Sequence, residues 1–296
     1  MPVKITCLCC RWRSIVPFRL PSPLQSRART GEHRPLEGEG PMLPYDLLAD
    51  LPEASPAWIS GRPPTIDIWW WAYAESQTDW GKVRSALTVP EQERTSSFRF
   101  DRDAIGFMAG RHLQRSVLSL YTGKAAENLN VVTGDHGKPY LAGETALAFN
   151  LSNTSGLAVL AVSRDCSVVG MDAEAHSVAL EAGTAEIICS AAESATLSML
   201  QGAERQALLL AFWTLKESLL KATGHGLTVE PHRLTVRVDP ASRAIRVEHD
   251  LPGDGAGWHH RLFRSPSGHM IAVSAQSDRA GLVFRQQSLP DPIFRF

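Results

Sequence analysis

Three things are scarce in this chain of 296 residues: cysteine, net charge and long apolar runs. Five cysteines are too few for a disulfide scaffold, and Cys7, Cys9 and Cys10 lie in one short segment, so we expect a reducing, cytoplasmic setting. A formal net charge of -1 lacks the basic excess of an electrostatic nucleic-acid binder. The apolar runs 66–74 and 207–215 are much shorter than the roughly 20 residues that cross a membrane. We therefore expect a protein that binds neither nucleic acid nor membrane.

The near-zero charge is the sum of two unlike parts of the chain. Residues 1–41 carry seven Lys and Arg against three Glu (+4), which leaves 23 basic and 28 acidic groups (-5) in the rest. Eleven of the 19 prolines lie within the first 64 residues. Such a segment buries too little apolar surface to offset its ordering entropy. We therefore expect a disordered basic leader over 1–41 and a connecting segment over 42–65.

Four hypotheses compete for the leader. A transit peptide fits as far as Thr30, because that part is Arg-rich and has no acidic residue. A secretory signal is disfavoured because Pro17 and Arg19 interrupt its only apolar core. A zinc site is disfavoured because the leader cysteines lack a second ligand pair at useful spacing. A reading frame that starts too early, with Met42 as the natural start, remains open beside the transit peptide.

The rest of the chain alternates between helical and strand-like patterns. Apolar residues at three- and four-residue spacing predict helices over about 101–121 and 203–223, each stopped by a glycine, Gly123 or Gly224. An aromatic, β-prone run predicts a first strand over 66–73. Short links between the runs after the first helix predict antiparallel pairing there. The further strands are expected at 146–151, 157–162, 168–171, 234–238, 245–248, 270–275 and 282–284.

The two helix ends repeat each other. Residues 111–123 and 212–224 are both 13-residue stretches that finish in Thr-Gly, at an offset of 101 residues, and both precede strand runs. A period of this size indicates two related lobes, because a solenoid would repeat every 20–50 residues. We therefore predict an α+β fold, a pseudo-two-fold duplication of two α+β lobes with antiparallel sheets. The first lobe is expected over 66–165 and the second over 166–285, followed by a tail at 286–296.

Carboxylates stand out in the second lobe. Asp172 and Glu174 follow an apolar strand two residues apart, so the alternation of a strand puts them on one face. This is either a solvated strand end or a pair of ligands for a hard divalent cation. Glu217 and Lys221 share one helix face, as a surface ion pair worth about 0.3–0.5 kcal/mol or as functional groups. The apolar stretch 207–213 beside them favours a buried helix and the functional interpretation.

Two weaker patterns precede these residues. The turn at 137–139, Gly-Lys-Pro, can offer backbone groups and an ammonium to a nucleotide. The strand end at 149–154 adds hydroxyl and amide donors suited to phosphate. Turns commonly contain such residues, so each pattern alone is only suggestive.

In this order and spacing the patterns resemble one family, the two-lobed 4′-phosphopantetheinyl transferases of the surfactin-synthetase-activating type. Its motifs GKP, FN(L/I)SH(S/T), G(V/I)D(V/I)E and W(S/T)xKE(S/A)xxK are similar to residues 137–139, 149–154, 170–174 and 213–221. The resemblance covers about residues 66–285. It implies an active site in the cleft between the two lobes.

The resemblance also implies roles for individual residues. The implied Mg²⁺ ligands are Asp172, Glu174 and Glu217. Lys221 is implied as the cation that contacts the pyrophosphate of coenzyme A. Glu193 is similar to a family glutamate that helps to deprotonate the attacking serine, although Ile188 and Cys189 replace the usual aromatic pair before it. The implied coenzyme A contacts are Arg94, Arg111, Lys138, Pro139, Ser152, Asn153 and Lys216.

One departure from the family pattern concerns Asn153, where the family usually has His. An amide can donate a hydrogen bond to phosphate but adds no positive charge, so we expect weaker coenzyme A binding than a His would give.

The implied activity is the Mg²⁺-dependent transfer of the phosphopantetheine arm of coenzyme A to a serine of an apo acyl or peptidyl carrier protein. The alternatives are a non-catalytic module that binds coenzyme A or a carrier protein, and a Mg²⁺-dependent phosphohydrolase. Two lobes in one chain would make a monomer sufficient for a complete site.

Overall fold

The computed structural model describes residues 63–134, 137–175, 180, 183–239, 241–249, 251 and 257–289, together with the backbone of 48–49. The expected leader at 1–41, with its three cysteines, lies outside the described residues. Within the described part, Cys166 and Cys189 are buried free thiols. No helix of that part is long and apolar enough to span a membrane.

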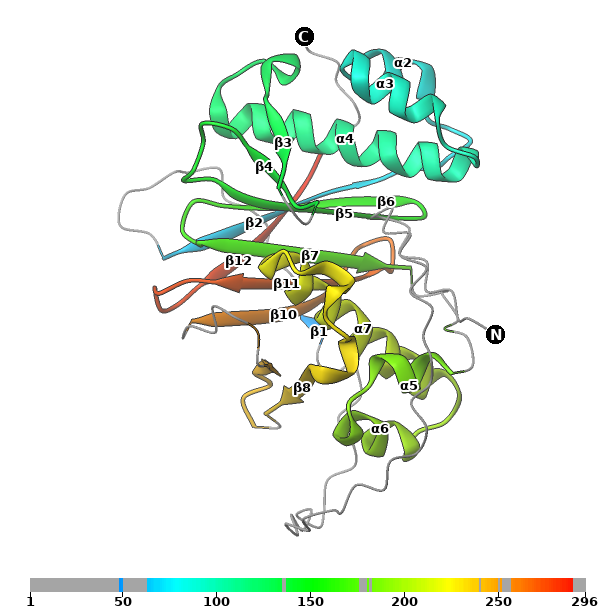
Figure 1. The fold of residues 1–296 in the computed structure, drawn as a ribbon, viewed down its shortest axis with the longest axis vertical. Coiled ribbons are helices and arrows are strands. Elements are labelled where there is room, and N and C mark those ends of the chain that lie inside the picture. Colours follow the sequence, from blue (N-terminus) through cyan, green and yellow to red (C-terminus); the bar gives the residue numbers. More distant parts are fainter. Residues whose placement is uncertain are drawn as a thin grey trace.

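The first lobe is a four-stranded sheet covered by helices (Figure 1). The strand order is β12-β2-β6-β5, and the long helix α4 lies over one face of the sheet. A small hairpin, β3-β4, stands beside the sheet. The bounds are β2 Thr65–Ala72, α2 Trp80–Ser85, α3 Val89–Ser96, α4 Asp101–Thr122, η1 Ala126–Asn128, β3 Val131–Thr133, β4 Pro139–Leu141, β5 Ala148–Thr154, β6 Leu157–Ser163 and β12 Val283–Ser288.

The second lobe repeats this plan. Its strand order is β7-β11-β10-β9-β8, with β1 joined in parallel to β10, and the long helix α7 lies against β7 and β11. The bounds are β1 Leu48–Ala49, β7 Val168–Glu174, α5 Thr184–Ile188, α6 Ala191–Ser198, α7 Gly202–Thr223, η2 Gly226–Thr228, η3 Pro231–Arg233, β8 Thr235–Val238, β9 Ile245–Glu248, β10 Trp258–Arg264 and β11 Met270–Gln276.

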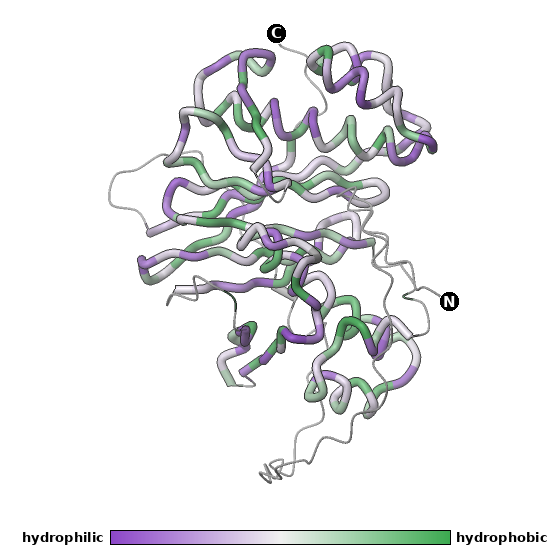
Figure 2. The backbone as a smooth tube through the Cα atoms, in the orientation of Figure 1, coloured by the Kyte–Doolittle hydropathy of each residue, from purple (hydrophilic) through white to green (hydrophobic). Residues whose placement is uncertain are grey.

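The two sheets stack face to face, with helices on both outer sides (Figure 1). Alternation along each strand sends one set of side chains toward the helix and the other toward the facing sheet. In β2, Trp69 and Trp71 pack with α4, whereas Ile66 and Ile68 join Met171 and other residues between the sheets. Figure 2 shows apolar stretches along the stacked strands and more hydrophilic residues in the outer helices of the first lobe. Three apolar layers therefore stabilise the molecule, and the middle one joins the lobes.

The predicted duplication is confirmed. Helices α4 and α7 are both 22 residues long and begin 101 residues apart, at Asp101 and Gly202. Each ends at a glycine in the left-handed region, Gly123 with φ 69° and Gly224 with φ 76°, where other residues would be strained. The strand order β2-β6-β5 of the first sheet recurs as β7-β11-β10 in the second.

Two expectations about strand pairing are wrong. The run at 168–171 does not pair with the strand before it, because β7 is the outer strand of the second sheet and pairs with β11. The short link after β6 instead carries the chain from one sheet to the other. The run at 282–284, expected in the second lobe, belongs to β12, which joins the first sheet in parallel with β2. Arg285 forms an ion pair there with the buried carboxylate of Asp67.

Gly170 fixes how closely α7 approaches β7. A Cβ atom at this position would overlap two backbone atoms of α7, Ser218 O and Ala222 N. Backbone atoms cannot move aside as the end of a flexible side chain can, so only glycine permits this helix–strand crossing.

We predict that Gly170→Ala lowers the free energy of unfolding by about 3 kcal/mol or more, because overpacking forces α7 away from the sheet. Urea unfolding measures this. The matched control is Gly81→Ala, which lies in the exposed helix α2 beside a movable side chain and should stabilise by about 0.5–1 kcal/mol. Equal stability of the two variants would contradict the close crossing.

A polar contact joins α7 to the sheet beside this crossing, because Ser274 of β11 is the cross-strand neighbour of Gly170. The Oγ atoms of Ser218 and Ser274 are 2.6 Å apart, and Ser274 Oγ is 2.8 Å from Nδ1 of His260. His260 is buried and stacks on Trp258 with ring centroids 6.0 Å apart. Burial first, and then nearby positive groups, lower the pKa of His260 to about 3.

This shift predicts a loss of stability in acid. Because the folded pKa of about 3 lies below the ordinary 6.5, the unfolded chain takes up the proton first as pH falls. The stability that neutral His260 supplies is therefore complete above pH 6.5 and is lost between pH 6.5 and 3. Urea unfolding across this range should show a smaller pH dependence for His260→Asn than for the parent chain. An unchanged pH dependence would show that His260 titrates as it does in the unfolded chain.

Candidate active site

The predicted carboxylates lie where β7 meets α7. Asp172 is fully buried and Glu174 is half-buried, and both project from β7 toward the helix. On α7, Trp213, Glu217 and Lys221 follow one another at four-residue spacing, so they share one helix face. Trp213 Nε1 donates to Glu174 Oε1 at 3.1 Å, and Lys221 Nζ donates to Asp172 Oδ1 at 2.6 Å. Glu217, midway between these two contacts, therefore faces the same strand.

The first lobe contributes Ser152 to this cluster. Its Oγ donates to Asp172 Oδ1 at 3.1 Å and accepts from Lys221 Nζ at 3.2 Å. A serine from β5, an aspartate from β7 and a lysine from α7 thus meet at the boundary between the lobes. The sequence predicted all three as site residues, and the structure brings them into direct contact.

The donor type of the three carboxylates suits Mg²⁺, which prefers oxygen ligands. Within the part of the chain that the structure describes, no group of three or more His, Cys, Asp or Glu side chains is arranged to hold a metal ion as it stands. Asp172 Oδ1 is held by the ammonium of Lys221 instead. The site therefore fits a hard cation by its chemistry, and Lys221 is the positive charge that the structure places in it.

Glu193 and Lys216 form a separate, buried ion pair inside the second lobe. Lys216 Nζ lies 2.5 Å from Glu193 Oε2 and also donates to Ile188 O at 2.7 Å. Glu193 Oε2 accepts from Ser190 N, which closes a capping box at the start of α6, and Oε1 accepts from Val236 N at 2.7 Å. Exposed side-chain fractions of 2% for Glu193 and 0% for Lys216 leave neither open to a ligand. Burial lowers the pKa of Lys216, and the Glu193 carboxylate opposes that shift.

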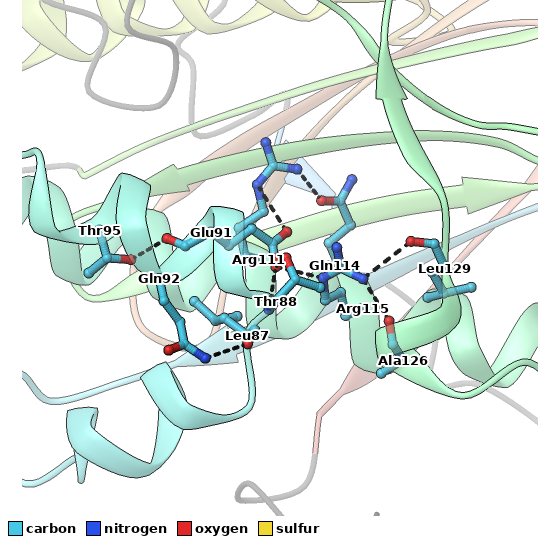
Figure 3. Close-up of polar contacts among 10 residues, drawn as sticks. All are labelled: Leu87, Thr88, Glu91, Gln92, Thr95, Arg111, Gln114, Arg115, Ala126 and Leu129. Carbon is cyan, nitrogen blue, oxygen red and sulfur yellow. Dashed lines mark hydrogen bonds and ion pairs between the residues drawn. The ribbon is translucent and has the colours of Figure 1, made fainter.

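The first lobe contains the counterpart of this pair (Figure 3). Glu91 forms a capping box with Thr88 at the start of α3, and its Oε2 accepts from Arg115 Nε of α4 at 2.7 Å. Arg115 also donates to Ala126 O and Leu129 O. Arg115 and Lys216 are 101 residues apart, the offset of the two long helices. A capping-box glutamate bound to a buried cation is therefore a structural device that both lobes share.

The arginines predicted as phosphate contacts lie in the first lobe, on α3 and α4. Arg111 Nη1 donates to Gln114 Oε1 at 2.5 Å (Figure 3). Its guanidinium stacks on Phe107. Arg94 stacks on Phe98. Arg111 Nε also lies 3.9 Å from Glu91 Oε1 in the same lobe. The role of both arginines as phosphate contacts stays a prediction.

The two neighbouring residues Ser152 and Asn153 face opposite sides of β5. Ser152 points to the lobe boundary, whereas Asn153 is buried against α4, where a Cβ at Gly106 would come within 2.8 Å of its Nδ2. Lys138, just before Pro139 at the start of β4, donates to Val169 O at 3.1 Å and to Ala222 O at 2.6 Å. Burial lowers the pKa of Lys138 to about 8.

Fold and site together define a duplicated two-lobed α+β protein with an acidic, lysine-containing site at the lobe boundary. Comparison with known proteins agrees with this class. A model described as the 4′-phosphopantetheinyl transferase superfamily matches residues 168–274, and a model of the N-terminal part of 4′-phosphopantetheinyl transferase matches residues 71–165. The chain belongs to the 4′-phosphopantetheinyl transferase family.

Several curated relatives are similar over most of the two lobes. The 4′-phosphopantetheinyl transferase psf-1 of Bacillus pumilus is 32% identical over 174 residues, which cover 58% of this chain and 73% of that protein. HetI of Nostoc sp. is 28% identical over 166 residues, 55% of this chain and 70% of that protein. Sfp of Bacillus subtilis is 24% identical over 201 residues, 68% of this chain and 87% of that protein.

We predict that Lys216→Met lowers the free energy of unfolding by about 3–5 kcal/mol, because it leaves the Glu193 carboxylate buried without its cation. The double variant Glu193→Leu/Lys216→Met should be more stable than Lys216→Met, since neither charge remains. Urea unfolding of the single and double variants measures both effects.

Arg115→Met is the matched variant in the first lobe and should destabilise less, because the Glu91 side chain is 13% exposed. If Lys216→Met unfolded like the parent chain, the buried pair would have no structural role, and Glu193 would be open to the proton transfer predicted from the sequence.

Proposed function

We propose that this protein transfers the 4′-phosphopantetheine arm of coenzyme A to a serine hydroxyl of an apo carrier protein. The products are a holo-carrier protein and 3′,5′-ADP. The observation that carries the proposal is the contact of Ser152, Asp172 and Lys221 at the lobe boundary, with Glu174 and Glu217 facing the same place.

The reaction forms a bond between the serine oxygen and the β-phosphorus of coenzyme A. The bond from that phosphorus to the 3′,5′-ADP group and the serine O–H bond break, and the proton is released together with 3′,5′-ADP. Negative charge grows on the phosphoryl oxygens and on the leaving group. Lys221 Nζ is already fixed by Asp172 and Ser152, so its charge is oriented before the reaction begins. When bound by Asp172, Glu174 and Glu217, Mg²⁺ would supply further charge compensation at the phosphoryl oxygens.

Burial and hydrogen bonds hold the charged groups of the site in fixed positions. Asp172 is fully buried in β7, and Lys221 shares its ammonium between two oxygens, so both groups are held in one geometry. Glu193 has both carboxylate oxygens engaged inside the second lobe, and we therefore assign it to the stability of that lobe rather than to the proton of the serine.

We also propose that the protein acts as a monomer in the cytoplasm. One chain supplies both lobes of the site, and the buried free thiols Cys166 and Cys189 suit a reducing compartment. Coenzyme A and an acyl or peptidyl carrier protein would be its partners.

We expect Asp172→Asn and Glu217→Gln to lower the rate of transfer by roughly 100-fold or more, because each removes a charge from the reacting site. The measurement is the mass gain of apo carrier proteins incubated with coenzyme A and Mg²⁺. The control is Glu204→Ala, an exposed acidic position in the first turn of α7, which should leave the rate unchanged.

The same assay distinguishes the other candidate activities. Release of product from coenzyme A without a carrier protein would indicate a phosphohydrolase, and binding of coenzyme A with no reaction would indicate a binding module. Full activity in Asp172→Asn and Glu217→Gln would overturn the assignment of the carboxylates.

A further inference from the structure

Strand β7 is the outer strand of the second sheet, and side chains of the first lobe contact its open edge. Met171 N donates to Asn150 Oδ1 at 2.8 Å, and Ala173 N donates to Ser152 Oγ at 3.2 Å. Val169 O accepts from Lys138 Nζ at 3.1 Å. In an extended strand, every second residue turns its backbone groups to the same edge, which is the spacing of 169, 171 and 173. Three side chains thus take the place that a neighbouring strand would fill.

Lys138 has a second contact that reaches the end of α7. Its Nζ donates to Ala222 O at 2.6 Å, within the last turn of the helix. The last carbonyl groups of a helix have no partner inside it, and a cation is favourable at this end. Val169 precedes Gly170 in β7, and Ala222 is one of the α7 residues whose backbone lies against Gly170. Lys138 therefore holds together the two elements that carry Asp172, Glu217 and Lys221.

Asn150 of β5 is a second first-lobe residue whose side chain binds the backbone of β7. The residue is 4% exposed, and its chain neighbours Phe149 and Leu151 pack with the first-lobe core. A polar amide in such a place needs a hydrogen-bond partner, and Met171 N of the other lobe provides it. Asp172 lies between Met171 and Ala173, so the two residues on either side of it are fixed by the first lobe.

We propose that Asn150 and Lys138 are positioning residues, which fix β7 and the end of α7 against the first lobe and thereby set the positions of Asp172 and Lys221. This proposal rests on the proposed function for its kinetic consequence, but its structural consequence is independent of activity. It gives Lys138 a role other than the phosphate contact implied by the sequence. The ammonium already donates to two backbone carbonyls, one in each of the elements that it joins.

Hydrogen–deuterium exchange tests the structural part without any substrate. Asn150→Leu has similar volume but no acceptor, so the Met171 amide should exchange about tenfold faster than in the parent chain, at a temperature well below unfolding. Asn150→Asp keeps an acceptor oxygen and should restore much of the protection. Thr133→Ala, on the exposed side of the hairpin, is the control. Unchanged exchange of Met171 and Ala173 in Asn150→Leu would overturn the proposal.

Kinetics separates positioning from phosphate binding at Lys138. Lys138→Gln keeps a neutral donor that can reach carbonyl oxygens, whereas Lys138→Met keeps only the length of the side chain. Positioning predicts that kcat falls about tenfold in Lys138→Met and recovers to within about threefold in Lys138→Gln, with the KM for coenzyme A nearly unchanged. A similar, large rise of KM in both variants, with weaker 3′,5′-ADP binding by calorimetry, would show a charge contact to phosphate and overturn the proposal.

The exchange experiment and the kinetic experiment also allow this proposal to be tested separately from the proposed function. If the parent chain modifies no carrier protein, the proposed function fails, while the exchange of the Met171 amide still decides whether Asn150 fixes β7.

Discussion

The close crossing of α7 over β7 is the constraint on which the site depends. At Gly170 the helix backbone lies where a side chain would otherwise stand. This contact brings Trp213 and Lys221 within hydrogen-bond distance of Glu174 and Asp172. A larger separation would leave the lysine unable to reach the carboxylate, so the small size of one residue determines the geometry of the charged cluster. The Ser218–Ser274 contact stabilises the same crossing, because Ser274 of β11 is the cross-strand neighbour of Gly170.

The duplication explains which charges are structural and which belong to the site. Glu91 with Arg115 and Glu193 with Lys216 occupy equivalent places, and both tie a short capped helix to a long one. Glu217 and Lys221 of the second copy replace the uncharged Ser116 and Leu120 of the first copy at the 101-residue offset. These two charges face β7, whereas the two equivalent ion pairs hold each lobe together.

The sequence predicted the elements whose signal is local. The long helices and their glycine stops are confirmed because apolar spacing and left-handed glycines need no tertiary context. The short helices α2, α3, α5 and α6 gave too few turns for a periodic signal, and β10 was missed because His259, His260 and Arg261 interrupt its apolar pattern. The resemblance of the motifs assigned Ser152 and Asp172 to one site, but their direct contact depends on how the two lobes meet. The burial of Lys216 against Glu193 likewise depends on how α6 packs on α7, which periodicity does not encode.

The return of β12 to the first sheet has a consequence for synthesis of the chain. Arg285 and Asp67 are 218 residues apart in sequence, yet they form one buried ion pair beside paired strands. During translation the first lobe therefore emerges with one strand missing and the edge of β2 uncovered. Contacts between such distant residues form late, and an open strand edge invites pairing with other chains. The first lobe is thus completed only after every described strand of the second lobe has been synthesised.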